Sequence, residues 1–269
     1  MTMNMLEMFE RLEDRVLLAA SVKMKGDTLI INGDGSDDAI YVSGAGLATG
    51  EVEVAHDSDG DGIVDTFLGT FDGVANIQIK SKGGDDAIGV FAVDITGDLT
   101  IVTGGGDDCV INTLSEIDGD VSVKTGGGND LALLLNCVIG GAASLVTGGG
   151  DDIAGAAACM IGGTSTINTG GGDDLVTLTH TVSTGIVNIN AGGGDDEVGL
   201  DDGNLVPPGS KVSGGGGRGD LFADGDEPGT PVFDISGFEI EATEFTPAAE
   251  TEFENLVSEC LLRLIPGEE

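Results

Sequence analysis

A short glycine-rich acidic segment recurs in this chain at a constant interval. Residues 103–108 read TGGGDD, and four close copies and one shorter copy lie on either side of them. The last acidic residue of each copy lies 22 residues from the next, with no insertion, and these residues are Asp86, Asp108, Asp130, Asp152, Asp174 and Asp196. So regular a repeat indicates one structural unit stacked on copies of itself.

Apolar residues keep the same period and alternate within each copy, as in Ile88-x-Val90 and Leu99-x-Ile101. Such alternation is typical of β-strands, and Gly97 with its equivalents every 22 residues marks a corner. A coil of 22 residues is too short to close around a helix. The predicted fold class is therefore all-β: a parallel β-helix solenoid of 22-residue rungs, each made of two or three short strands joined by glycine turns.

Three parts of the chain depart from the regular rungs. Residues 1–22 form an N-terminal segment, and the predicted β-helix spans residues 23–244. Asp38 lies 48 residues before Asp86, four more than two rungs, so we expect an inserted hairpin at residues 44–72. Residues 245–269 are predicted to form a C-terminal capping helix, which would cover the open edge of the last rung.

The insertion carries an acidic loop, because residues 57–65 read DSDGDGIVD. This loop resembles the short calcium loops of the EF-hand, dockerin and thrombospondin type 3 families, with a glycine at the sharp bend. Leu68 stands where the EF-hand has its final glutamate, and strand-like residues on both sides predict the tip of a hairpin. The ligands that the resemblance implies are Asp57, Asp59, Asp61 and Asp65.

The charge balance limits the partners of the chain. Its 48 acidic and 10 basic residues give a formal net charge of −38. This balance disfavours nucleic acid and anionic membrane surfaces, because phosphate groups are bound by Lys and Arg. No apolar run reaches the length of a transmembrane helix, so we expect no membrane insertion. The four cysteines show no spacing typical of a disulfide framework or a metal site, and Cys137 and Cys159 are expected to be reduced.

Stacking places the repeated aspartates in a row with intervals of about 4.8 Å. Two bare carboxylates at this distance repel each other by roughly 3–4 kcal/mol at an effective dielectric constant of about 20. Between residues 83 and 200 there are seventeen acidic residues and one basic residue, Lys124. Aspartates in a partly exposed row have pKa values of about 3.9 and stay ionised at neutral pH. We therefore expect solution cations between the rungs, and Ca²⁺ fits best because the turn offers only oxygen ligands.

Residues 104–110 resemble the RTX (haemolysin-type) calcium-binding repeat, G-G-x-G-x-D-x-U-x. The resemblance implies that Asp108 and its equivalents are side-chain ligands and that nearby carbonyls complete the shell. RTX repeats return every nine residues and form two calcium rows, whereas one turn per 22 residues predicts a single row. The predicted ligands of the row are Asp38, Asp85, Asp86, Gly105, Asp107, Asp108, Gly127, Asp130, Gly149, Asp151, Asp152, Gly171, Asp173, Asp174, Gly193, Asp195, Asp196 and Asp220.

Residues 12–18 read LEDRVLL and resemble the LEPR-xLL segment at the start of many large, repeat-containing bacterial surface or exported proteins, with Asp14 in place of the proline. The resemblance implies export. The sequence thus predicts a calcium-binding, non-enzymatic structural or adhesive protein that folds in a calcium-dependent manner. We expect it to be extracellular or at a bacterial cell surface, with cell-envelope polysaccharide or other surface proteins as candidate partners.

Two other functions stay open. Parallel β-helices include polysaccharide lyases that use calcium and a basic residue, although Lys124 is the one basic residue of the regular rungs and aromatic sugar platforms are scarce. A surface- or ice-binding solenoid is the second alternative. It would use the outward polar column Thr100, Ser122, Ser144, Thr166 and Asn188, although the regular Thr-x-Thr ladder of ice binders is absent.

Overall fold

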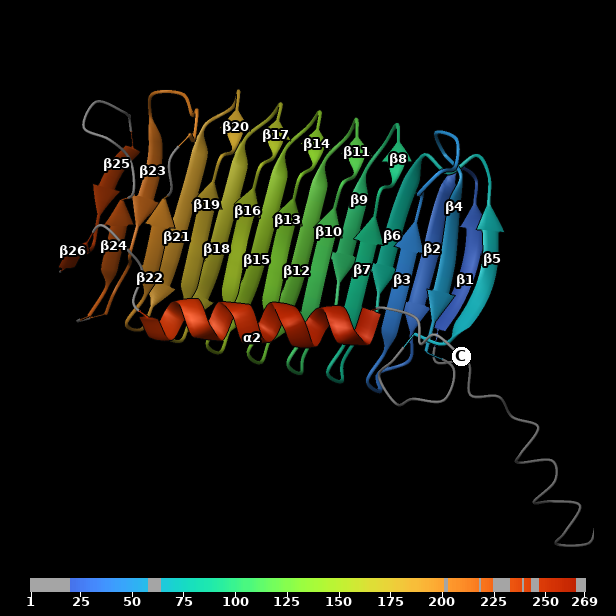
Figure 1. The fold of residues 1–269 in the computed structure, drawn as a ribbon, viewed down its shortest axis with the longest axis horizontal. Helices are drawn as coiled ribbons and strands as arrows, with labels where there is room; N and C mark the ends of the chain where they lie inside the picture. The colour runs from blue at the N-terminus through green and yellow to red at the C-terminus, as the bar shows by residue number, and fades with distance from the viewer. Residues whose placement is uncertain are drawn as a thin grey trace, which may run out of the picture.

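The computed structural model describes residues 20–57, 64–200, 203–217, 219–224, 233–238, 240–242 and 247–264. These residues form a β-solenoid whose rungs stack side by side along one axis (Figure 1). Residues 22 apart are paired in parallel, as in Val110 with Ala132 and Ala132 with Ala154. The predicted all-β solenoid of 22-residue rungs is confirmed.

The strands belong to three sheets. Sheet A contains, in order, β1 (Ala20–Lys25), β2 (Thr28–Gly33), β6 (Asn76–Lys80), β9 (Leu99–Val102), β12 (Val121–Gly127), β15 (Ala143–Gly149), β18 (Ser165–Gly171), β21 (Val187–Gly193), β23 (Ser210–Ser213) and β25 (Phe233–Ser236). Sheet B contains β26 (Ile240–Ala242), β24 (Leu221–Asp224), β22 (Glu197–Leu200), β19 (Leu175–Thr179), β16 (Ile153–Ala157), β13 (Leu131–Leu135), β10 (Cys109–Thr113), β7 (Ala87–Phe91), β3 (Ala39–Ser43), β4 (Val52–His56) and β5 (Thr66–Phe71). The short sheet C contains β20 (Val182–Ser183), β17 (Met160–Ile161), β14 (Val138–Ile139), β11 (Glu116–Ile117) and β8 (Asp94–Ile95).

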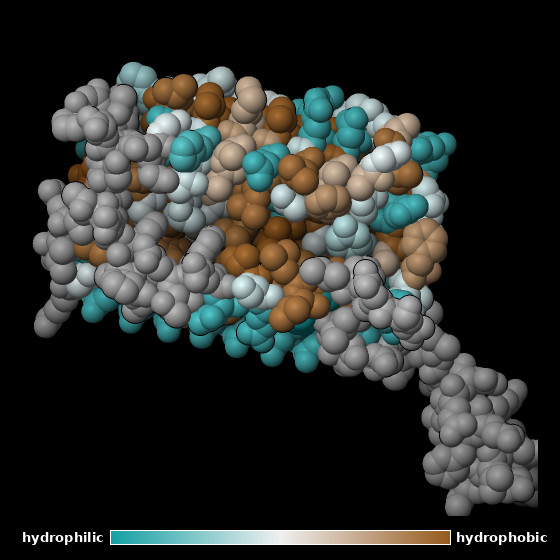
Figure 2. Space-filling model, viewed as in Figure 1, coloured by the Kyte–Doolittle hydropathy of each residue, from teal (hydrophilic) through white to brown (hydrophobic). Residues whose placement is uncertain are grey.

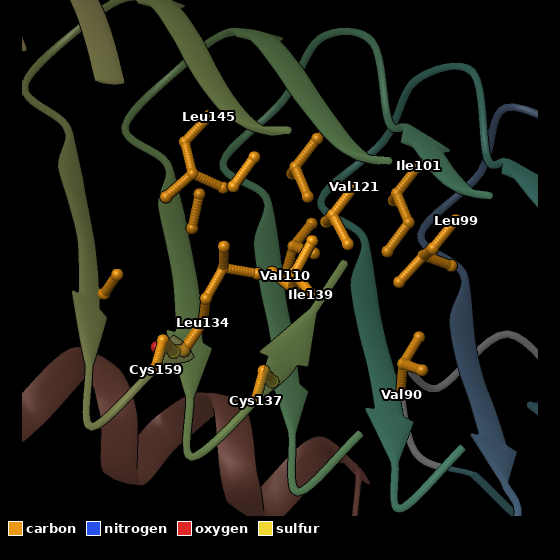
Figure 3. Packing of buried hydrophobic residues seen from close by; sticks show 14 of the residues in the cluster. Val90, Leu99, Ile101, Val110, Val121, Leu134, Cys137, Ile139, Leu145 and Cys159 are labelled. Atoms are coloured by element: carbon orange, nitrogen blue, oxygen red, sulfur yellow. The ribbon is translucent and has the colours of Figure 1, made fainter. Parts of the chain in front are cut away.

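The main hydrophobic core fills the inside of the solenoid. Ladders of like side chains from the three sheets meet there, such as Val110 from sheet B, Ile101 from sheet A and Ile139 from sheet C (Figure 3). Cys137 and Cys159 lie in the same core as free, buried thiols, which confirms the expectation that they are reduced. Because side chains alternate along a strand, each strand of sheet B also presents residues outward.

The inserted segment forms the predicted hairpin. Strand β3 pairs antiparallel with β4, which pairs antiparallel with β5, so the hairpin extends one edge of sheet B. Sheet A ends similarly, because β1 runs antiparallel to β2. Strand β1 was not predicted and takes residues 20–22 from the expected N-terminal segment. Residues 1–19, which carry the LEPR-like segment, lie outside the described residues.

The C-terminal helix α2 (Pro247–Leu264) is present, but its predicted position over the last rung is wrong. It lies along the outer face of sheet B and contacts β3 and β7 near the start of the solenoid (Figure 1). Leu264 packs over Gly89 and beside Tyr41, and Cys260 forms a disulfide with Cys109. The physical reason is an apolar outer face on sheet B, where Leu131, Leu133 and Ile153 form a second buried cluster that needs a cover.

The polarity of the surface follows this arrangement. In Figure 2, apolar side chains gather in the middle of the face formed by sheet B, and hydrophilic side chains follow the lower edge, where the turns between sheets A and B lie. Among the described residues, no helix combines the length and the apolar character needed to cross a membrane.

Candidate functional site

The acidic turn connects sheet A to sheet B in every rung. In one rung, β12 ends at Gly127 and β13 begins at Leu131, so Asp130 stands directly before the sheet B strand. The turn needs glycine because Gly126 and Gly128 have φ angles of 123° and 132°. A Cβ atom on Gly128 would also collide with the Gly106 carbonyl oxygen of the neighbouring rung. The glycines therefore permit rungs to stack at strand spacing through the turn.

The second acidic residue of each turn points into the solenoid and is buried. Asp130 and Asp152 are each 1% exposed. The Asp108 N–H donates to Oδ1 of Asp130 at 2.8 Å, and the Asp130 N–H donates to Oδ1 of Asp152 at 2.9 Å. The same bond joins every neighbouring pair of this inner row, which consists of Asp38, Asp86, Asp108, Asp130, Asp152, Asp174, Asp196 and Asp220.

The inner row corrects one premise of the sequence analysis. We expected partly exposed carboxylates whose mutual repulsion only solution cations could relieve. The structure buries the carboxyl groups and gives one oxygen of each to a peptide N–H, which partly compensates the negative charge. The sequence could not show this burial, because an aspartate next to glycines is as compatible with an exposed turn as with a buried one.

The first acidic residue of each turn forms a separate, exposed row. Its hydrogen bonds run in the opposite direction along the solenoid, since the Asp173 N–H donates to Oδ1 of Asp151 at 2.8 Å. Asn129 takes the place of aspartate without interrupting the row, because its Oδ1 accepts the Asp151 N–H at 2.8 Å. The predicted ligands that belong to this outer row are Asp85, Asp107, Asp151, Asp173 and Asp195. The row therefore depends on a hydrogen-bond acceptor and not on a charge.

A third ladder, which was not predicted, lies at the corner between sheet C and sheet A. There, the Asp120 N–H donates to Oδ1 of Asp98 at 2.8 Å, and the Ala142 N–H donates to Oδ1 of Asp120 at 2.7 Å. The signal was present in the sequence, because Asp98 and Asp120 are 22 residues apart and follow glycines. Side-chain carboxylates thus cap backbone N–H groups at two corners of the solenoid.

The second oxygen of most inner carboxyl groups has no hydrogen-bond partner. Asp108 differs, because Thr103 donates its hydroxyl to Oδ2 of Asp108 at 2.5 Å. The hydroxyl of Thr125 lies near the Asp130 carboxyl group and lowers its pKa, but its oxygen is 3.2 Å from the Thr147 carbonyl oxygen and makes no hydrogen bond of normal geometry to Oδ2 of Asp130. The buried oxygens without a partner are Asp38 Oδ1 and the Oδ2 atoms of Asp86, Asp130, Asp152, Asp174, Asp196 and Asp220. Burying a carboxylate oxygen without a hydrogen-bond partner costs folding free energy. Binding a proton or a cation would lower that cost.

Burial changes the acidity of the inner row. It raises the pKa of Asp86, Asp130 and Asp174 to about 7, and neighbouring carboxylates of the row add to the shift. Burial also raises the pKa of Asp38, Asp108 and Asp196 to about 6 and raises that of Asp152. Hydroxyl groups of the same rung, such as that of Thr125 beside Asp130, and peptide N–H donors oppose the shift. Part of the row therefore holds protons near neutral pH, where an aspartate in water is ionised.

The ligand atoms available in the inner row are all oxygens, which is the ligand type that calcium prefers. The described residues contain no group of three or more His, Cys, Asp and Glu side chains placed around one ion. A calcium ion at this row would therefore need carbonyl, hydroxyl or water oxygens in addition to the carboxyl groups.

The glycine carbonyls predicted as ligands already serve as acceptors between rungs. The Gly105 carbonyl accepts the Gly84 N–H at 3.0 Å, and the Gly127 carbonyl accepts the Gly106 N–H at 2.9 Å. The carbonyls of Gly149, Gly171 and Gly193 accept equivalent bonds from the preceding rung. A carbonyl oxygen has two lone pairs, so one remains for a further donor or an ion.

The predicted calcium loop meets the beginning of the inner row. Asp57 is fully buried, and its N–H donates to the Ala39 carbonyl at 2.9 Å, next to Asp38. Asp65 is exposed, and its N–H donates to the His56 carbonyl at 3.1 Å. Asp59 and Asp61 lie outside the described residues. At the opposite end of the row, Asp220 accepts the Asp196 N–H at 3.1 Å, as its place in the decayed last copy of the turn predicted.

Comparisons of the chain with protein-family models, with curated proteins and with solved structures found no match. The RTX resemblance therefore rests on the turn motif. What the structure establishes is a β-solenoid of 22-residue rungs with a ladder of buried aspartates.

Proposed function

We propose that this chain is a calcium-binding structural solenoid whose rungs stack around ions held by the inner aspartate row. The observation that carries the proposal is the set of buried carboxylate oxygens without a hydrogen-bond partner, one in nearly every rung. The inner aspartates are at most 2% exposed. An ion that neutralises them would therefore enter as the rungs stack, which couples ion binding to folding.

Protons are the competing source of positive charge. The raised pKa values mean that a mildly acidic medium protonates the row without any metal. Above pH 7 the row ionises, and a divalent cation then becomes the more effective partner. Calcium suits this role better than magnesium, because magnesium gives up its bound waters reluctantly and demands a strict octahedral shell.

The disulfide supports the proposed location outside the cell. Cys109 and Cys260 are 151 residues apart and tie the C-terminal helix to sheet B. Structural disulfides of this kind persist mainly in oxidising environments such as the periplasm and the cell exterior. The LEPR-like segment implies the same destination. We propose a non-enzymatic structural or adhesive role at a bacterial surface, with envelope polysaccharide or other surface proteins as partners.

A calcium titration of the folded chain tests the proposal. At pH 7.5, we expect calcium to raise the melting temperature and the β-sheet circular dichroism signal, and a chelator to reverse both. Asp130→Asn removes one inner charge and keeps an oxygen acceptor, so it should weaken the calcium effect. The matched control is Asp151→Asn in the exposed outer row, which should leave the effect intact. Identical melting with calcium and with chelator would exclude calcium-coupled folding.

A further inference from the structure

A groove lies on the outer face of sheet B, where the inserted hairpin extends the sheet beyond the regular rungs. Its volume is about 260 Å³. Its lining includes Tyr41 and Ser43 of β3, Glu53 and Ala55 of β4, Asp65 directly before β5, and Phe67 within β5. None of these residues belongs to the inner row of aspartates. The groove is therefore a separate candidate for an interaction site.

The pairing of the three strands places two aromatic residues on either side of a small one. Tyr41 pairs with Ala55 across β3 and β4, and Ala55 pairs with Phe67 across β4 and β5. Paired residues share one face of a sheet, so Tyr41 and Phe67 form two walls and Ala55 forms the floor between them. Two strand spacings separate the walls by about 10 Å, which leaves room for one planar or chain-like group.

The ring of Phe67 is kept on the outer face although it is 60% exposed. The register of β4 and β5 shifts at a β-bulge, and Leu68 and Phe71 of the same strand pack against the main core. A bulge of this kind changes the direction in which a side chain points. Single exposed apolar residues are common on protein surfaces. Phe67 differs from them because a second aromatic residue, Tyr41, lies on the other side of the same groove.

The charges at the groove favour a positively charged ligand. Glu53 pairs with Ser43 and is exposed at one end, and Asp65 is exposed at the other end. Among the described residues that line the groove, none is basic. Aromatic faces and carboxylates both attract cations, and a guanidinium group is flat, stacks on aromatic rings and pairs with carboxylates. An arginine side chain therefore fits the groove, whereas an anionic ligand would be repelled.

The edge of the sheet indicates where such an arginine comes from. Strand β5 ends sheet B, and no other described strand pairs with its outer edge (Figure 1). At the same end of the solenoid, β1 carries the exposed Lys23 and Lys25, which are typical of an edge protected against pairing. Strand β5 reads TFLGTF and has neither a charge nor a proline. An extended segment of another protein can therefore lie along β5 and reach over it with a long side chain.

We propose that the groove between Tyr41 and Phe67 binds an arginine side chain on an extended segment of a partner protein. The inference rests on the part of the proposed function that gives the chain surface proteins as partners. It does not depend on calcium at the inner row. Asp65 is also a predicted ligand of the acidic loop, so Glu53 is the residue with which the role of charge is tested.

Tyrosine fluorescence reports on the groove directly, because Tyr41 is the single tyrosine of the chain and tryptophan is absent. The full chain is titrated in calcium at pH 7.5 with the peptide Thr-Val-Arg-Val-Thr, which has blocked ends. We expect a saturable change in fluorescence. The same peptide with citrulline in place of arginine keeps the shape and lacks the charge, so it should bind roughly tenfold more weakly.

Two variants and a matched control locate the binding. Phe67→Ala removes one wall and should weaken peptide binding roughly tenfold, and Glu53→Gln should weaken it and reduce its dependence on salt. Both side chains are exposed, so the variants should fold, which circular dichroism checks. The control is Leu205→Ala, which removes an apolar side chain that is 61% exposed elsewhere on the solenoid and should leave binding unchanged.

The inference is wrong if the arginine and citrulline peptides bind equally, or if Phe67→Ala binds the arginine peptide as well as the native chain does. A response to cellohexaose but not to the peptide would show a sugar site instead. Free arginine that binds as tightly as the peptide would exclude an extended protein segment as the ligand. If melting ignores calcium while the tyrosine still responds to the peptide, calcium-coupled folding fails and the groove stands.

Discussion

Acidification in the presence of a chelator should stabilise this protein, which is unusual for a chain with so many carboxylates. The inner aspartates carry the effect, because burial raises the pKa of Asp86, Asp130 and Asp174 to about 7 from an ordinary value of 3.8. Between these values the folded row holds protons that the unfolded chain has released. Stability from this source is fully present below pH 3.8 and is lost as the pH rises through 7.

The size of the effect follows from the pKa difference. Three pH units correspond to about 4 kcal/mol for each fully buried aspartate that is ionised in the fold. The neighbouring carboxyl groups titrate as one coupled row, so each contributes about half of that value, about 2 kcal/mol. Three such residues then cost about 6 kcal/mol at pH 8, against a typical total stability of about 5–15 kcal/mol. An ionised row without cations would therefore remove a large part of the free energy of unfolding of the domain.

Urea unfolding followed by circular dichroism at pH 5, 6, 7 and 8, with chelator present throughout, measures this loss. We expect the urea midpoint to fall steadily from pH 5 to pH 8. Asp130→Asn should flatten the profile by removing one titrating group, and Asp151→Asn should reproduce the native profile because it alters the exposed row. A midpoint that stays constant from pH 5 to pH 8 would refute the buried, proton-binding row.

Three further predictions concern single contacts. Asp130→Ala leaves the Asp108 N–H without its acceptor and should cost about 1–3 kcal/mol in urea unfolding, more than Asp130→Asn, which keeps one; equal losses would show that the acceptor is unimportant. Reduction, or Cys260→Ser, frees the helix from sheet B and should lower stability by about 2–4 kcal/mol in thermal melting, whereas an unchanged melt would mean that the bond adds nothing. Gly106→Ala forces a Cβ against the Gly84 carbonyl at a φ of 126° and should cost more than about 1 kcal/mol. Gly105→Ala has its nearest neighbour 3.6 Å away and is the tolerated control, so similar losses for the two would contradict the turn geometry.

The repeat was enough to predict the stacked rungs, because residues 22 apart must pair once the period is unbroken. It also predicted the alternating apolar residues such as Ile88 and Ile101, which are buried because alternation in a strand fixes which side chains face the core. The C-terminal helix was predicted, but its location was not. An apolar helical face fits an open sheet edge and an apolar sheet surface equally well, and only the folded arrangement shows that sheet B has such a surface.

The candidate site was predicted in position but not in environment. The spacing of Asp108 and Asp130 gave the row, whereas its burial depends on how the glycine turn directs each carboxyl group. The Cys109–Cys260 disulfide could not be inferred either, because its two residues come from a regular rung and a helix 151 residues away. The spacing of repeated residues predicts which of them stack on one another. It does not predict where a non-repeating segment, such as the C-terminal helix, packs on the solenoid.

The most direct test of the central claim is a crystal structure of the protein grown in calcium at pH 7.5, with ions located by anomalous scattering. Calcium-coupled folding predicts a line of anomalous peaks between successive carboxyl groups of the inner row, each within bonding distance of the oxygens that have no hydrogen-bond partner. A fully ordered solenoid with calcium only on the exposed outer row, or with none at all, would contradict it and would leave protons as the source of neutralisation.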